Sequence, residues 1–144
     1  MSLLDNSDLI EIKLYYKHIA VGSGKKLVII DDKKAEELLQ DEEKSKGIEV
    51  LETNWSMLTW KEQNEVMGLA SKNVDPITGE PKFNFYVYRD AIIKKCLRSW
   101  NLLDNNQPVL VTSDAIDKLP GPVVIDIYQK FERLLEYSEE ELKN

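Results

Sequence analysis

The feature that most constrains this chain is a helical pattern of apolar residues over positions 85–100. The pattern contains two stripes. One stripe consists of Phe85, Tyr88, Ile92 and Cys96, and the adjacent stripe consists of Tyr86, Ile93, Leu97 and Trp100. At about 100° per residue, the two stripes together cover about half of the helix circumference. A helix with so wide an apolar arc either forms the centre of a small core or divides its surface between that core and a partner.

The first third of the chain has the pattern of a sheet. Residues 9–21 predict a strand, because apolar and polar side chains alternate with a period of two near its start, as in a half-buried strand. Residues 27–30 are a second short strand. Gly22-Ser23-Gly24 lies between them and is typical of a tight turn, because glycine adopts positive φ at little cost. Alternation occurs again over residues 48–55. We therefore predict a β-hairpin followed by a third strand.

The remainder has the pattern of helices. Thr59 and Glu62 have the spacing of a capping box, which predicts a helix to about residue 71. The two-striped helix follows, then a brief helix near residues 114–119, and then a last helix from 123 to about 137. Residues 33–46 form either an exposed marginal helix or a mobile connection.

Strands followed by helices predict an α+β fold, with a C-terminal bundle of three to four helices. We expect a single domain over residues 1–144, because 144 residues can bury one core. Its β-rich part is residues 9–55, its helical part is residues 59–137, and residues 138–144 form a frayed tail.

Charge and composition narrow the class of partner. With 19 basic and 26 acidic residues the formal net charge is −7, which argues against a nucleic-acid partner. The sequence has no apolar run long enough for a bilayer and no signal-peptide pattern, so a membrane role is not expected. A single cysteine excludes a disulfide within the chain and favours a reducing, cytoplasmic compartment.

Catalytic residue types are scarce. His18 is the only histidine and Cys96 the only cysteine, which is too few for a clustered metal site and gives no sign of a Cys–His pair. The Gly-Lys pair at 24–25 is not a phosphate-binding loop, because Ile19 stands where that loop needs glycine and Lys26 where it needs Ser or Thr. We therefore expect a protein that is not an enzyme, with no catalytic residues, cofactor or metal.

The second stripe of the long helix exceeds what one facing helix would cover, so we expect part of it to bind another protein. Arg89 falls between the two stripes and has two interpretations: an internal ion pair with a glutamate, which is the commoner arrangement, or an anchor in an interface. The predicted partner-binding residues are Tyr86, Arg89, Ile93, Leu97 and Trp100. The hypothesis fails if the chain itself covers all four residues of the stripe.

A family resemblance adds to this interpretation. Thr59, Trp60 and Glu62 at a helix entry, with Leu119-Pro120 before the last helix, make residues 55–137 resemble the tail assembly chaperones of long-tailed bacteriophages. The resemblance implies a chaperone in the host cytoplasm that coats the apolar tape-measure protein. Such a chaperone keeps this client soluble until tail-tube subunits polymerise around it. The implied partners are the tape-measure protein and tail-tube subunits, and a homo-oligomer is left open.

Two other functions remain open. One is a structural component of the tail or baseplate that is retained in the virion, and the other is a generic cytoplasmic protein-interaction module. Presence in purified virions separates the structural component from the chaperone. A neighbouring gene for a long helical tape-measure protein would favour the phage functions over the generic module.

Overall fold

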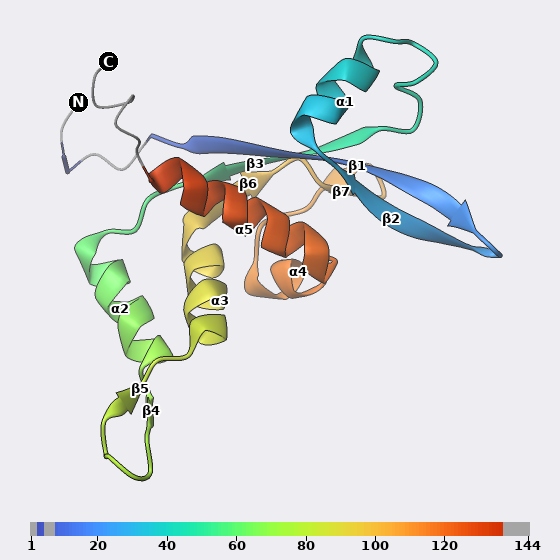
Figure 1. The fold of residues 1–144 in the computed structure, drawn as a ribbon. Helices are drawn as coiled ribbons and strands as arrows, with labels where there is room; N and C mark the ends of the chain where they lie inside the picture. The colour runs from blue at the N-terminus through green and yellow to red at the C-terminus, as the bar shows by residue number, and fades with distance from the viewer. Residues whose placement is uncertain (1–2, 5–7, 137–144) are drawn as a thin grey trace.

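In a computed structural model, residues 3–4 and 8–136 are described, and the predicted tail at 138–144 lies outside them. The described residues form an α+β fold, as predicted (Figure 1). In chain order its elements are β1 (Ile10–Val21), β2 (Gly24–Ile30), α1 (Asp32–Leu39), β3 (Glu49–Trp55), α2 (Trp60–Ala70), β4 (Asn73–Val74), β5 (Pro81–Lys82), α3 (Phe85–Cys96), β6 (Leu97–Trp100), β7 (Leu103–Asp104), β8 (Gln107–Pro108), α4 (Ser113–Asp117) and α5 (Gly121–Leu135).

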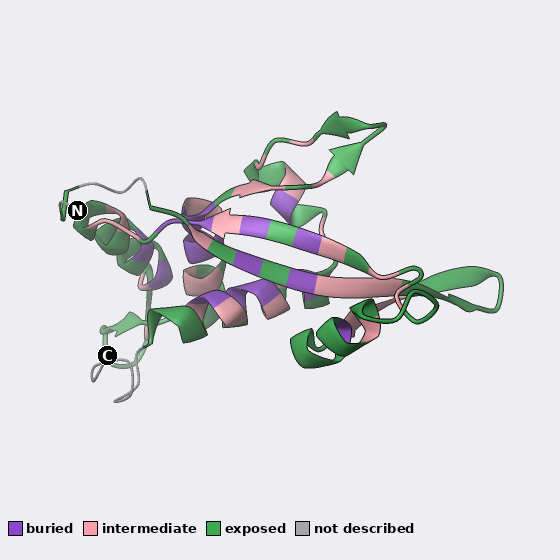
Figure 2. Cartoon of the chain, turned by 90° about the horizontal axis from the view of Figure 1, so that it is seen from above, coloured by how far each residue is buried: buried purple, intermediate pink, exposed green. Residues whose placement is uncertain are grey.

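The main sheet is antiparallel and has the strand order β2-β1-β3-β6. The predicted hairpin is β1–β2, and its turn begins at Gly22 with a φ of 59°, as a type II′ turn requires at that position. Residues 10–16 of β1 pair with β3, whereas residues 15–21 pair with β2. The far half of the hairpin therefore projects beyond the rest of the sheet, and Figure 2 shows its tip as exposed.

The core lies between one face of the sheet and the helices beneath it (Figure 1). Leu14 and Leu51 are paired across β1 and β3 and are buried on this face. Trp55 on β3 stacks on Phe131 of α5, with ring centroids 4.6 Å apart. Fully burying a large apolar side chain stabilises a fold by about 1.5–3 kcal/mol. The contact between the sheet and α5 is therefore central to the stability of the domain.

The helices do not form a bundle of their own, which corrects the finer part of the prediction. α5 packs on β1, and α2 packs against α3. Figure 1 shows α1 above the sheet, and α2 and α3 extending away from it on the lower side with the β4–β5 hairpin at their far end. The boundary between strands and helices is also wrong, because β6 lies within the predicted helical part and completes the sheet.

The predicted helix over residues 85–100 is wrong at its end. α3 stops at Cys96, and Leu97 has extended backbone angles of φ −71° and ψ 115°. In the extended chain, the polar residues after Leu97 form hydrogen bonds with Asn54 of β3 and with Ser56, which follows β3. Arg98 Nε donates to Ser56 Oγ at 2.7 Å, and Asn54 Nδ2 donates to Ser99 Oγ at 3.1 Å. These contacts, added to the ladder with β3, favour a strand over another turn of helix.

Candidate protein-binding surface

The five predicted partner-binding residues do not share one surface. Ile93 and Leu97 are each only 3% exposed, because the end of α3 and the start of β6 both face the core. Trp100 is half-buried on β6, where its indole Nε1 donates to the carbonyl oxygen of Val109 at 2.7 Å. Tyr86 is 72% exposed and Arg89 is half-buried. The stripe that motivated the prediction is therefore mostly core, and Tyr86 and Arg89 are the part that lies at the surface together.

Arg89 has aromatic partners instead of the ion pair that was the commoner expectation. Its guanidinium carbon lies 5.5 Å from the ring centroid of Phe85 and 5.5 Å from that of Tyr86. Among the residues that the structure describes, Arg89 forms no ion pair. A guanidinium over an aromatic face at a partly exposed site contributes about 0.5–1 kcal/mol. Arg89 therefore fixes the position of two exposed rings rather than neutralising a buried carboxylate.

Beside these rings lies a groove of about 330 Å³, which we call the aromatic groove. Its lining residues are Asn73, Lys82, Phe83, Asn84, Phe85 and Tyr86. Phe83 is 50% exposed and Phe85 is 45% exposed, so all three rings of the groove present about half or more of their surface to solvent. Aromatic side chains carry large apolar areas, and such exposed groups mark interaction sites on folded proteins.

Asn84 holds the aromatic groove in place. It is the N-cap of α3, and its side-chain oxygen accepts hydrogen bonds from the amides of Tyr86 at 3.0 Å and Val87 at 3.2 Å. The amide of Asn84 donates to the carbonyl oxygen of Ala70 at 2.8 Å. The start of α3 is thereby tied to the end of α2, and a capped helix start is a rigid place for a binding site.

Further apolar side chains are exposed on the same pair of helices and their connecting hairpin. Trp60, the first residue of α2, is 79% exposed. Its place follows from the capping box, in which Thr59 accepts from the amide of Glu62 and Glu62 accepts from the amide of Thr59. Met67, Leu69, Val74 and Ile77 are exposed as well. The sequence signal that could have located this surface is the aromatic density of residues 83–88.

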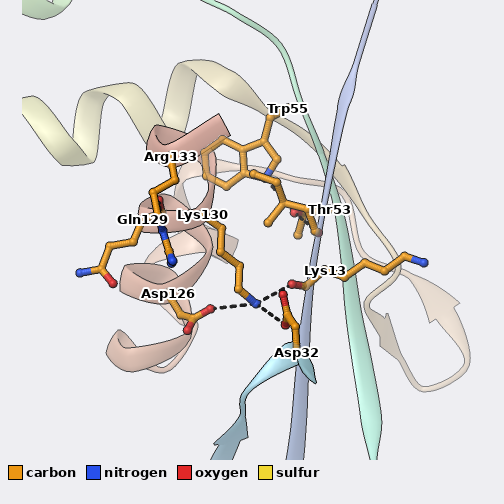
Figure 3. A network of polar contacts seen from close by, with 9 residues as sticks. Lys13, Asp32, Thr53, Trp55, Asp126, Gln129, Lys130 and Arg133 are labelled. Atoms are coloured by element: carbon orange, nitrogen blue, oxygen red, sulfur yellow. Dashed lines mark hydrogen bonds and ion pairs between the residues drawn. The ribbon is translucent and has the colours of Figure 1, made fainter. Parts of the chain in front are cut away.

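A second, polar groove of about 490 Å³ lies between α5, β1 and α1. Lys130 extends into it from α5 (Figure 3). Its ammonium nitrogen donates to the carbonyl oxygen of Lys13 at 2.8 Å and to Asp32 Oδ1 at 2.9 Å, and it pairs with Asp126 Oδ1 at 3.2 Å. This arrangement joins α5 to β1 and to the start of α1.

The two residues considered for nucleophilic catalysis lie at opposite ends of the sheet. Cys96 precedes Leu97, which pairs with Trp55, and Trp55 pairs in turn with Ile10. His18 lies eight residues farther along β1, a separation of about 27 Å at the rise of a strand. Burial raises the pKa of the Cys96 thiol to about 12, so the thiolate nucleophile does not form near neutral pH.

Neither a metal site nor a membrane-spanning helix is found in the described residues, and comparison with known proteins gives no match. Within residues 3–4 and 8–136, no group of three His, Cys, Asp or Glu side chains is placed to hold a metal ion. No helix of the described chain is long and apolar enough to cross a bilayer. Comparisons of the chain with protein-family models, curated proteins and solved structures gave no match.

Proposed function

We propose that this chain binds an apolar helical segment of another protein in the aromatic groove, and that it serves as a non-enzymatic tail assembly chaperone for a phage tape-measure protein. The observation that carries the binding role is the exposure of Phe83, Phe85 and Tyr86 along one groove at the capped start of α3. The chaperone role is supported by the resemblance over residues 55–137. The proposed site replaces the stripe suggested by the sequence, of which Ile93 and Leu97 belong to the core.

The physical basis is the recognition of an amphipathic helix by an apolar groove. A client helix would cover the three rings and extend onto the exposed side chains of α2. Aromatic anchors contribute much of the energy in such interfaces. The formal net charge of −7 supports the second requirement of a chaperone, because an acidic coat keeps an apolar client in solution. The site of action in this proposal is the host cytoplasm, where client and tail-tube subunits are made.

The alternative is a structural component of the phage tail or baseplate, which would use the same surface for a permanent contact. The two functions differ in the fate of the chain. A chaperone leaves when tail-tube subunits polymerise around the client, whereas a structural component remains. If mass spectrometry detects this chain in stoichiometric amount in purified virions, the result would favour the structural function.

The proposed function is tested by co-expressing the chain with a phage tape-measure protein. We expect the client to be soluble with the wild-type chain and insoluble with a Phe85→Ser, Tyr86→Ser double variant, because the double variant removes two apolar walls of the groove. Leu110→Ser is the matched control, since Leu110 is also highly exposed but lies outside the groove. A client that stays insoluble with the wild type, or soluble with the double variant, would refute the proposal.

A further inference from the structure

The outer edge of β2 is an open strand edge. In the sheet order β2-β1-β3-β6, β2 pairs with β1 on one side, and no strand formed by residues 3–4 or 8–136 lies on the other. Its apolar residues Leu27, Val28, Ile29 and Ile30 are all half-buried rather than buried. A two-stranded projection of this kind is marginally stable in water, and an unpaired edge is a template for another strand.

Side chains cover two unpaired stretches elsewhere in this sheet, one on β3 and one on β1. Asn101 accepts from the amide of Glu52 at 2.9 Å and donates to the carbonyl oxygen of Val50 at 3.0 Å, which covers β3 beyond its pairing with β6. Lys130 donates to the carbonyl oxygen of Lys13 on β1. Among the described residues, no side chain forms a comparable hydrogen bond to β2. The edge of β2 is therefore left for a partner backbone.

The hairpin register defines which groups of β2 face outward. Val21 pairs with Gly24 across the two-residue turn, and the register then continues without a bulge to Tyr15 and Ile30. The closing pair of such a hairpin is hydrogen-bonded, and hydrogen-bonded and non-hydrogen-bonded pairs alternate along the ladder. Val28 therefore directs its amide and carbonyl to β1, whereas Leu27 and Ile29 direct theirs to the open edge.

We propose that β2 pairs with β2 of a second copy of this chain, antiparallel and with the two-fold axis at Val28. In this register Leu27 lies opposite Ile29 of the second copy, and their outward backbone groups form the hydrogen bonds. Lys25 then lies opposite Asp31 of the second copy, and the two-fold axis repeats this pair. The two sheets become one continuous sheet of eight strands. The segment has lysines at one end and aspartates at the other, so antiparallel pairing of two copies places the lysines of each copy beside the aspartates of the other.

The position of Asp31 supports this register. Asp31 is exposed, and as the N-cap of α1 it makes no side-chain capping hydrogen bond, so its carboxylate is available to a lysine. Lysines on an edge strand often prevent pairing, but in this register they meet an opposite charge. The proposed dimer does not depend on the chaperone function and can be tested separately.

The position of the axis is tested by disulfide formation in a Cys96→Ala background, which removes the only native thiol. Val28→Cys should form a covalent dimer under mild oxidation, because residues opposite each other in a non-hydrogen-bonded pair have Cα atoms about 4.5 Å apart. Lys26→Cys is the control on the same strand. It lies opposite residue 30 of the second copy, about 13 Å from its own counterpart, and should not be cross-linked.

The charge pairing is tested by sedimentation of the full chain over a range of concentrations. Lys25→Asp should weaken the dimer about tenfold, because it places like charges opposite each other twice across the axis. The exchange variant Lys25→Asp, Asp31→Lys should restore dimerisation. A wild-type chain that sediments as a monomer, a Lys26→Cys chain cross-linked as readily as Val28→Cys, or a dimer insensitive to Lys25→Asp would overturn the proposal.

Discussion

Thr53 offers the sharpest test of how the core is held together. It is fully buried on β3, and its hydroxyl makes two hydrogen bonds of 2.7 Å. It donates to the carbonyl oxygen of Ile12 on β1. It also accepts from the indole Nε1 of Trp55, and Figure 3 labels both of these side chains. One hydroxyl therefore joins two strands and satisfies the only polar atom of a buried tryptophan side chain.

Thr53→Val removes this hydroxyl with almost no change in side-chain volume. Two hydrogen bonds are lost, and the buried indole N–H of Trp55 is left without an acceptor. Losing the bond to Ile12 costs about 1 kcal/mol, and leaving the indole donor unsatisfied costs about 1–3 kcal/mol, so the expected destabilisation is about 2–4 kcal/mol. This is a large fraction of the stability of a domain, which is typically about 5–15 kcal/mol.

Urea unfolding followed by circular dichroism measures this effect. The midpoint should fall while the dependence on urea concentration stays unchanged, since the variant exposes the same surface when it unfolds. Thr53→Ser is the control, because it keeps the hydroxyl and loses one methyl group, at about 1 kcal/mol. A Thr53→Val chain as stable as the wild type, or more stable than Thr53→Ser, would refute the role assigned to the hydroxyl.

Three further predictions concern other parts of the molecule. Burial raises the pKa of the Cys96 thiol to about 12, so Cys96 should react with a thiol reagent at pH 8 only after unfolding. The free energy of unfolding should also fall as the pH rises from 9 towards 12, because the thiol loses its proton at a lower pH in the unfolded chain than in the folded chain. Lys130→Met should lower the free energy of unfolding by about 2–3 kcal/mol in a urea titration, since it leaves the partly buried carboxylate of Asp126 unpaired. Arg89→Leu should weaken client binding in a pull-down while thermal stability changes by less than about 1 kcal/mol, because its contacts are with exposed rings.

Short-range patterns were sufficient for much of the fold. The alternation of residues 9–21 located β1 to within one residue, and the Thr59–Glu62 spacing located the first turn of α2. Both signals are local, because a strand face and a helix cap are each set by residues a few positions apart. Cys96, a member of the first apolar stripe, is buried.

The C-terminal end of α3 could not be predicted from short-range patterns. Ile93, Leu97 and Trp100 have helical spacing, yet Leu97 and Trp100 lie on a strand. The determining partners, Asn54 and Ser56, are more than 40 positions away in the chain, so no local window contains them. The same error produced the predicted binding stripe, because burial of Ile93 and Leu97 depends on the sheet that β6 completes. Exposure of Phe83 and Trp60 likewise depends on where α2 and α3 extend, which periodicity does not specify.

The central claim, that an apolar client binds in the aromatic groove, is tested most directly by hydrogen exchange of the full chain with and without a soluble tape-measure fragment. If the claim is correct, the fragment slows amide exchange over residues 82–89, while exchange in the β1–β2 hairpin stays unchanged. Slowed exchange elsewhere with residues 82–89 unaffected, or no change at saturating fragment, would contradict it.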